Sequence, residues 1–269
     1  MMVRSLWTGA TGMKAMQTNI DVIANDLTNI NTVGYKKRVV NFQDLLYQTM
    51  RAAGLQGGNG VNLPVGVQVG LGVRVGGTTP VMTVGPFNET GNWYDMAIEE
   101  NLATGIRNFF RVDTGNGYAY TRDGSFRLDS EGRLVTINGY FLDPQPGPIA
   151  ANAVSWQITP EGSVQQMLPN ATAFEEVGVI NLFTFVNPAG LDPLGGNLWR
   201  ETAASGESTG GQPGAAGFGR IRSNFVEQSN VDAISEMVNM IAAQRAYEFN
   251  SKSITTSDEM LSTVNQLKR

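Results

Sequence analysis

The feature that most constrains this 269-residue chain is a regular apolar spacing at its two ends. Near the N-terminus, apolar side chains recur at steps of three, four or seven residues. Such residues share one face of an α-helix, and a mean step of 3.5 is typical of a coiled coil. We therefore expect an N-terminal helix that ends near Asn31, with Gly34 in the left-handed conformation that closes many helices. The stripe consists of Leu6, Met13, Met16, Ile20, Ile23, Leu27 and Ile30.

The C-terminal end carries a second apolar stripe, in which every seventh residue is apolar. Ser229 and Asp232 have the spacing of a capping box, so we expect the second helix to begin there. Each stripe is too wide for one partner helix to cover, which favours packing against other copies of the chain. Packing of both helices on a single globular core is the alternative. The stripe residues are Met240, Tyr247, Ile254 and Leu261.

The middle of the chain, residues 80–225, has the pattern of a β-domain. Short alternating runs are separated by turn dipeptides such as Asn116-Gly117 and Asn138-Gly139, a combination typical of antiparallel hairpins. Residues 202–219 are expected to form a flexible loop. The predicted strands include 109–112, 118–122, 126–128, 134–136 and 140–142.

The segment between the first helix and the β-domain is rich in Gly and Pro. Residues 42–51 are expected to form a short helix, and residues 54–76 an extended or hairpin-like stretch. The predicted fold class is α+β, in which the terminal helices form a coiled-coil core domain and a mostly antiparallel β-domain is inserted. The expected boundaries are 1–34 for the N-terminal helix, 35–79 for the extended subunit-contact segment, 80–227 for the β-domain and 228–269 for the C-terminal helix.

Composition excludes several classes of function. The net charge of -5 argues against a general affinity for nucleic acid. No apolar run is long enough to span a membrane. The chain contains neither Cys nor His, and no complete catalytic site is evident, so we expect no enzyme activity, metal or cofactor.

The aromatic residues of the middle region leave a binding function open. Trp93, Tyr94, Tyr118 and Trp156 could form a surface that recognises peptidoglycan or protein. Aromatic residues in an alternating β pattern more often belong to a core.

Two long motifs resemble the signatures of bacterial flagellar rod and hook proteins. ANDLTNINTVGYKK, residues 24–37, is similar to their N-terminal signature, and residues 229–261 are similar to their C-terminal one. NFQDLLYQTM and LPVGVQVGLGVRV look most like the distal rod member, with the proximal rod and hook proteins as alternatives. The motif residues are Asn25, Leu27, Asn29, Gly34, Gln244, Arg245, Tyr247 and Asn250.

The resemblance implies a structural subunit of a stiff hollow tube that carries torque through the periplasm to the hook. The implied partners are copies of the same chain, other rod proteins, the hook protein, the surrounding ring bushings and the flagellar type III export apparatus. The chain departs from the family pattern at residues 99–108, which look like a small insertion between Ala97-Ile98 and Phe109-Phe110.

Overall fold

The structure is a computed structural model that describes residues 2–51, 56–57, 61–62, 66–100, 105–150, 152–169 and 173–267. The chain forms two compact units. Unit 1 comprises Met1–Leu27, Arg38–Thr79 and Asp232–Arg269, and unit 2 comprises Thr28–Lys37 and Pro80–Val231. The chain therefore passes from unit 1 into unit 2 and back more than once.

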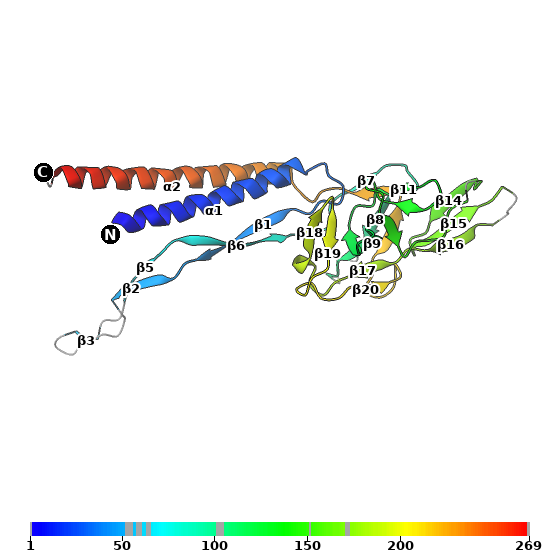
Figure 1. Cartoon of the computed structure of the whole chain (residues 1–269), viewed down its shortest axis with the longest axis horizontal. Helices are drawn as coiled ribbons and strands as arrows, with labels where there is room; N and C mark the ends of the chain where they lie inside the picture. Colours follow the sequence, from blue (N-terminus) through cyan, green and yellow to red (C-terminus); the bar gives the residue numbers. More distant parts are fainter. Residues whose placement is uncertain are drawn as a thin grey trace. The chain divides into compact units, whose positions relative to one another are not determined.

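Unit 1 contains two long helices, α1 (Met2–Thr28) and α2 (Ala233–Leu267), which lie side by side and antiparallel (Figure 1). Small residues of α1 allow close packing. A methyl group at Gly9 would lie 2.8 Å from Cγ1 of Ile254, and one at Gly12 would lie 2.9 Å from the Asn250 amide. Near the start of α1, the hydroxyls of Ser5 and Ser257 are hydrogen-bonded at 3.0 Å.

The ends of the helices differ from expectation. Helix α1 stops at Thr28, so Ile30 lies in the following turn rather than on the helix. Gly34 has the expected positive φ of 70°, but it lies too far beyond α1 to cap it. Helix α2 begins after Asp232, whose carboxylate accepts the Ile234 N–H at 3.4 Å. The cap is therefore this single aspartate and not a box that includes Ser229.

Residues 38–79 of unit 1 form a two-stranded ribbon, which lies in sequence between the two parts of unit 2. β1 (Arg38–Asp44) pairs with β6 (Val73–Pro80), and β2 (Tyr47–Arg51) pairs antiparallel with β5 (Val67–Gly70). β3 (Gln56–Gly57) pairs with β4 (Val61–Asn62) farther along. The short helix expected at 42–51 is wrong because the returning segment supplies cross-strand partners, which override a weak local preference. The expected hairpin-like character is confirmed, although residues 54–55, 58–60 and 63–65 of that stretch lie outside the described residues.

Unit 2 is built from short strands, all of whose recorded pairings are antiparallel. The largest sheet has the order β11-β12-β13-β9-β10-β19-β18, with β17 joining β9 to β20. β14, β15 and β16 form a second sheet, and the pairs β21-β8 and β22-β7 complete the unit. The strands are β7 (Phe87–Glu89), β8 (Met96–Glu99), β9 (Asn108–Asp113), β10 (Tyr118–Thr121), β11 (Arg127–Leu128), β12 (Leu134–Val135), β13 (Phe141–Asp143), β14 (Ser155–Ile158), β15 (Ser163–Met167), β16 (Glu175–Val179), β17 (Leu182–Thr184), β18 (Asp192–Gly195), β19 (Leu198–Arg200), β20 (Thr209–Gly211), β21 (Arg220–Ser223) and β22 (Phe225–Glu227), with a 3-10 turn at Pro188–Gly190.

The core of unit 2 lies on both faces of β9. Successive side chains of a strand point to opposite faces, and Phe109 and Phe110 accordingly join different clusters. Phe110 packs edge-on against Phe126 at 5.3 Å between ring centroids, while Phe109 contacts Phe185 in the same geometry at 5.8 Å. Both faces of this strand are therefore buried.

The five strands predicted between residues 109 and 142 are all present, with ends shifted by at most one residue. The loop expected at 202–219 contains β20, which pairs with β17. The suggested insertion at 99–108 spans the link from β8 to β9. Its residues 101–104 lie outside the described part of the chain.

Candidate functional site

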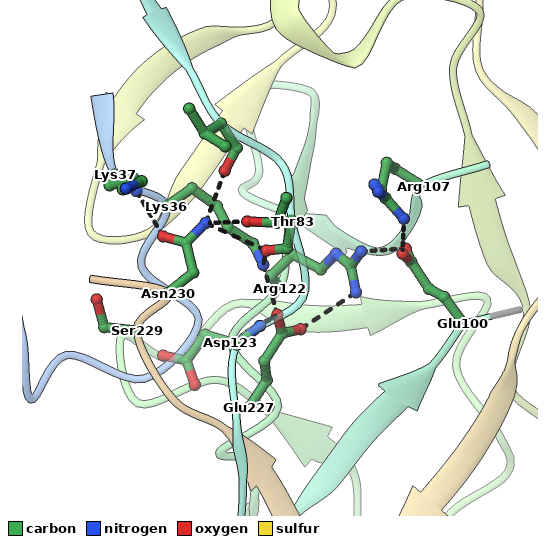
Figure 2. Close-up of polar contacts among 12 residues, drawn as sticks. Lys36, Lys37, Thr83, Glu100, Arg107, Arg122, Asp123, Glu227, Ser229 and Asn230 are labelled. Atoms are coloured by element: carbon green, nitrogen blue, oxygen red, sulfur yellow. Dashed lines mark hydrogen bonds and ion pairs between the residues drawn. The ribbon is translucent and has the colours of Figure 1, made fainter. Parts of the chain in front are cut away.

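A buried charge cluster occupies the place in unit 2 where three distant parts of the sequence meet (Figure 2). Its members, which we call the charge cluster, are Lys36, Glu100, Arg107, Arg122 and Glu227. Lys36 lies between α1 and β1. Glu100 follows β8, Arg107 precedes β9, Arg122 follows β10, and Glu227 ends β22.

Glu227 is the central acceptor of the cluster. Its Oε1 accepts hydrogen bonds from Lys36 Nζ and from the Gly85 N–H at 2.9 Å, and its Oε2 accepts one from Arg122 Nη1 at 3.1 Å. Lys36 also donates to the Thr83 carbonyl at 2.7 Å. The side chains of Lys36, Arg122 and Glu227 are at most 1% exposed, so each charge depends on its partners instead of water.

Glu100 forms the second anionic position. It accepts hydrogen bonds from Arg122 Nη2, from the Asn108 N–H at 2.8 Å and from Arg107 Nη1 at 2.7 Å. Three cations thus share two carboxylates, which leaves one excess positive charge in a buried site. This excess is consistent with the lowered pKa of Lys36, which falls to about 8 from an ordinary 10.5 through burial first and the nearby Arg122 second.

This pKa shift gives a pH dependence with a defined sign. Between about pH 8 and pH 10.5, Lys36 is neutral in the folded chain but still protonated when unfolded. The unfolded state then binds more protons, so the free energy of unfolding of unit 2 should rise with pH in this window. We expect a rise of up to about 3 kcal/mol in wild type relative to Lys36→Met, measured by urea unfolding from pH 7 to pH 10.5. Parallel curves for the two proteins would contradict the prediction.

Residues 28–37, which we call the strap, contact the cluster through backbone as well as side chain. The Gly34 N–H donates to the Glu227 carbonyl at 2.7 Å. Asn230 accepts the Lys37 N–H at 2.8 Å and donates to the Val81 carbonyl at 2.8 Å (Figure 2). Asn230 therefore joins the strap to the chain that leads into β7.

Gly34 should be intolerant of any side chain. It has φ of 70°, and a Cβ there would lie 2.7 Å from the backbone of Arg122 and Asp123. We expect Gly34→Ala to lower the free energy of unfolding of unit 2 by about 2–4 kcal/mol, because strain and a backbone clash add.

Gly91→Ala is the matched control for this change. Gly91 has φ of 72°, and a methyl group added there would meet no other atom within 4 Å. The control should lose only about 1 kcal/mol, the cost of the left-handed backbone. If Gly34→Ala and Gly91→Ala lowered the free energy of unfolding in urea equally, the proposed clash of a Gly34 side chain with the backbone of Arg122 and Asp123 would be contradicted.

The predicted stripe residues are distributed along the helices of unit 1, except Ile30, which lies in the turn after α1. Ile23 is buried within the chain, and Tyr247 remains 39% exposed. Ile254 packs against Gly9. The remaining stripe residues are half-buried: Leu6, Met13, Met16, Ile20, Leu27, Ile30, Met240 and Leu261.

Much of the apolar surface of unit 1 is uncovered within one chain. Exposed large apolar side chains run along α2 and over both strands of the ribbon. A hollow of about 480 Å³ opens between α1, α2 and the ribbon, with Gly9, Gly70 and Met50 in its wall. The exposed side chains include Ile234, Met237, Val238, Ile241, Phe249, Met260, Val264 and Leu267 on α2, and Val39, Phe42, Leu46, Tyr47, Met50, Val67 and Val69 on the ribbon.

The motif residues occupy different structural positions. Asn29 accepts a hydrogen bond from the Thr32 hydroxyl at 3.1 Å and shapes the turn after α1. Asn250 lies against Gly12, and Arg245 pairs with Glu248 at 2.9 Å. Asn25 and Gln244 lie on exposed positions of their helices.

Sequence reasoning missed the charge cluster. Lys36 lies inside the N-terminal motif and Asn230 inside the C-terminal one, but no spacing connects residues almost two hundred positions apart.

Of the aromatic residues considered for binding, Tyr94 and Trp156 stack on each other at 5.4 Å against the core, whereas Trp93 and Tyr118 are exposed.

Two further kinds of site were considered for the described residues: a membrane-spanning helix and a metal-binding cluster. Among the described residues, no helix combines the length and mean hydropathy needed to cross a bilayer. Within the same residues, no three carboxylates, histidines or cysteines gather as a metal site would require.

Comparison with protein families matches the chain in three parts. Residues 6–36 match "Flagella basal body rod protein", residues 106–166 match "Flagellar hook protein FlgE/F/G D1 domain", and residues 222–267 match "Flagellar basal body rod FlgEFG protein C-terminal". These descriptions cover rod and hook proteins together and do not separate them.

Individual relatives decide between the members. The chain is 44% identical to the flagellar basal-body rod protein FlgG of Borreliella burgdorferi, with both chains fully covered. It is 43% identical to the FlgG of Buchnera aphidicola subsp. Schizaphis graminum, covering 99% and 100% of the two chains, and 42% identical to that of Bacillus subtilis, with full coverage of both. The chain belongs to the FlgG family of flagellar basal-body rod proteins. As a FlgG-family chain, it is a structural subunit of the flagellar rod and not an enzyme.

FlgG membership also decides among the distal rod, proximal rod and hook proteins, which the motifs alone left open. The expected distal rod assignment is confirmed, and the relatives give no support to the proximal rod, hook or peptidoglycan-binding alternatives. A FlgG-family subunit associates with copies of itself and with other rod and hook proteins in the basal body.

Proposed function

We propose that the helices of unit 1 pack as coiled coils with those of neighbouring copies and form the wall of a hollow, rigid drive shaft. The observation that carries this proposal is the uncovered apolar surface of α2, where Ile234, Ile241, Phe249 and Val264 are all exposed in the single chain. Burying each such side chain contributes about 1.5–3 kcal/mol, so polymerisation is the favourable way to cover them. The stripe residues on the helices, from Leu6 to Leu27 on α1 and from Met240 to Leu261 on α2, would supply further contacts.

We assign the ribbon a role in stiffness. A two-stranded ribbon is marginally stable by itself, and its exposed Val39, Phe42, Tyr47 and Val67 offer apolar surface to adjacent subunits. Packing between neighbours would hold the ribbon and resist bending of the tube. The domain boundaries expected from the sequence would then separate a helical wall, a subunit-contact segment and an outer β-domain.

The remaining partners follow from this placement. A shaft that crosses the periplasm would turn inside ring bushings, and its subunits would reach the tip through the flagellar export apparatus. The charge cluster would act inside each subunit, where it joins the segments that flank the two helices.

Electron microscopy of the purified chain at high concentration tests the proposal. We expect straight tubes from the full chain and bent tubes from a variant in which residues 54–70 are replaced by a short Gly-Ser turn. The variant keeps both helices, so it should still polymerise. Absence of tubes from the full chain would contradict the assembly role, and equally straight variant tubes would contradict the role of the ribbon.

A further inference from the structure

We propose that the strap, residues 28–37, docks last onto unit 2 and can be released while the rest of the unit stays folded. The strap runs from the end of α1 to the start of β1, both of which belong to unit 1. It is therefore a short piece of unit 2 whose two ends both continue directly into unit 1. Docking of the strap onto unit 2 would therefore couple formation of helix α1 to folding of the β-domain.

The first observation is the way in which the strap is held. It contains no strand, and its backbone is held by separate bonds. The Gly34 N–H donates to the Glu227 carbonyl at 2.7 Å, and the Asn230 N–H donates to the Tyr35 carbonyl at 3.4 Å. Asn197 donates to the Val33 carbonyl at 2.8 Å, Asn230 accepts the Lys37 N–H at 2.8 Å, and the Val81 N–H donates to the Lys37 carbonyl at 2.8 Å. The two bonds from the side chains of Asn197 and Asn230 can break without disrupting a ladder, whereas the bond to the Lys37 carbonyl lies at the end of the β1-β6 pair.

The segment on the other side of the cluster is held differently. Residues Phe225–Glu227 form β22, and all three pair with β7. The Gln228 N–H adds a bond to the Pro86 carbonyl at 2.9 Å. Release of this segment requires loss of a continuous set of cross-strand bonds, whereas release of the strap does not.

The second observation is the charge balance. Without Lys36, the two arginines of the cluster match its two carboxylates, and Glu227 keeps its bonds to Arg122 and Gly85. Without Glu227, three cations would share Glu100 alone. The charges facing Lys36 are Glu227, Arg122 and Glu100. The cluster is therefore electrically complete before the strap arrives, and the strap adds an excess cation that must leave water.

Hydrogen exchange of the full chain in dilute monomeric solution tests this order. After correction for intrinsic rates, we expect the backbone amides of Gly34 and Lys37 to exchange at least tenfold faster than those of Val226 and Gln228, which lie at hydrogen-bonded positions of the β22-β7 pair. Equal corrected rates would overturn the proposal, because they would mean that strap and strand open together.

Two variants sharpen the measurement. Asn197→Gly removes the amide that holds Val33 and suits the positive φ of 61° at this position. It should speed exchange of the strap about fivefold or more and leave the amides of Val226 and Gln228 unchanged. Equal acceleration of both segments would overturn the proposal.

Lys36→Met removes the excess cation. Lys36→Met should slow hydrogen exchange of the strap amides or leave it unchanged. The control Lys14→Met, on α1, should do the same. Exchange of the strap more than threefold faster in Lys36→Met than in this control would overturn the proposal, because Lys36 would then be an anchor of the strap.

Discussion

Replacing Glu227 with Gln should lower the free energy of unfolding of unit 2 by about 3–5 kcal/mol, the range measured when one partner of a buried ion pair is lost. Glu227 faces both Lys36 and Arg122, and all three side chains are almost completely buried. The amide would leave three cations with Glu100 as their only counter-charge. Lys36 and Arg122 are fully buried and have no solvent to compensate for the lost charge, whereas Arg107 is 20% exposed.

Urea unfolding followed by tryptophan fluorescence measures this effect. Trp93, Trp156 and Trp199 all belong to unit 2, so a Trp7→Phe background confines the signal to that unit. Glu99→Gln is the matched control, because Glu99 is the exposed neighbour of Glu100 on the adjoining strand. A loss for Glu227→Gln within about 1 kcal/mol of the control would disprove the assigned role of the cluster.

A double variant tests the charge balance itself. Lys36→Met combined with Glu227→Gln restores the single excess positive charge of the wild type. We expect the double variant to be more stable than Glu227→Gln alone, with a coupling of at least about 1 kcal/mol. Simple additivity of the two single-variant effects on the free energy of unfolding would mean that the side chains act independently.

Ile254→Asp should abolish assembly of the tube. Ile254 lies against Gly9, where an added Cβ would come within 2.8 Å of its side chain, and it belongs to the stripe proposed to face neighbouring subunits. A carboxylate there would be buried without a partner, which costs several kcal/mol. Because about 1.4 kcal/mol corresponds to a factor of ten, the concentration needed for polymerisation should rise by at least about a hundredfold.

The measurement is the polymer fraction in sedimentation against protein concentration. Thr255→Asp adds the same charge at the adjacent exposed position and should polymerise nearly as wild type does. Unit 2 should unfold at the wild-type urea concentration in both variants, which separates loss of assembly from loss of folding. Polymerisation of Ile254→Asp at the wild-type concentration would remove Ile254 from the proposed contact.

The sequence alone determined the features that depend on local periodicity. A 3.5-residue repeat specifies a helix face wherever it occurs, so both terminal helices were predictable. Alternation between Asn-Gly and Asp-Gly turns likewise located β9 to β13. The linear motifs were sufficient for the family, because Gly34 and the residues around Asn250 stand at fixed positions within them.

Only the tertiary structure decided the features that depend on partners distant in sequence. Residues 42–44 and 47–51 are strands because β6 and β5 supply their hydrogen bonds, and no local pattern encodes that return. Lys36 and Glu227 are separated by 191 positions, and each alone reads as an ordinary surface charge. Burial makes them interdependent, since a charge removed from water must find its counter-charge inside the fold.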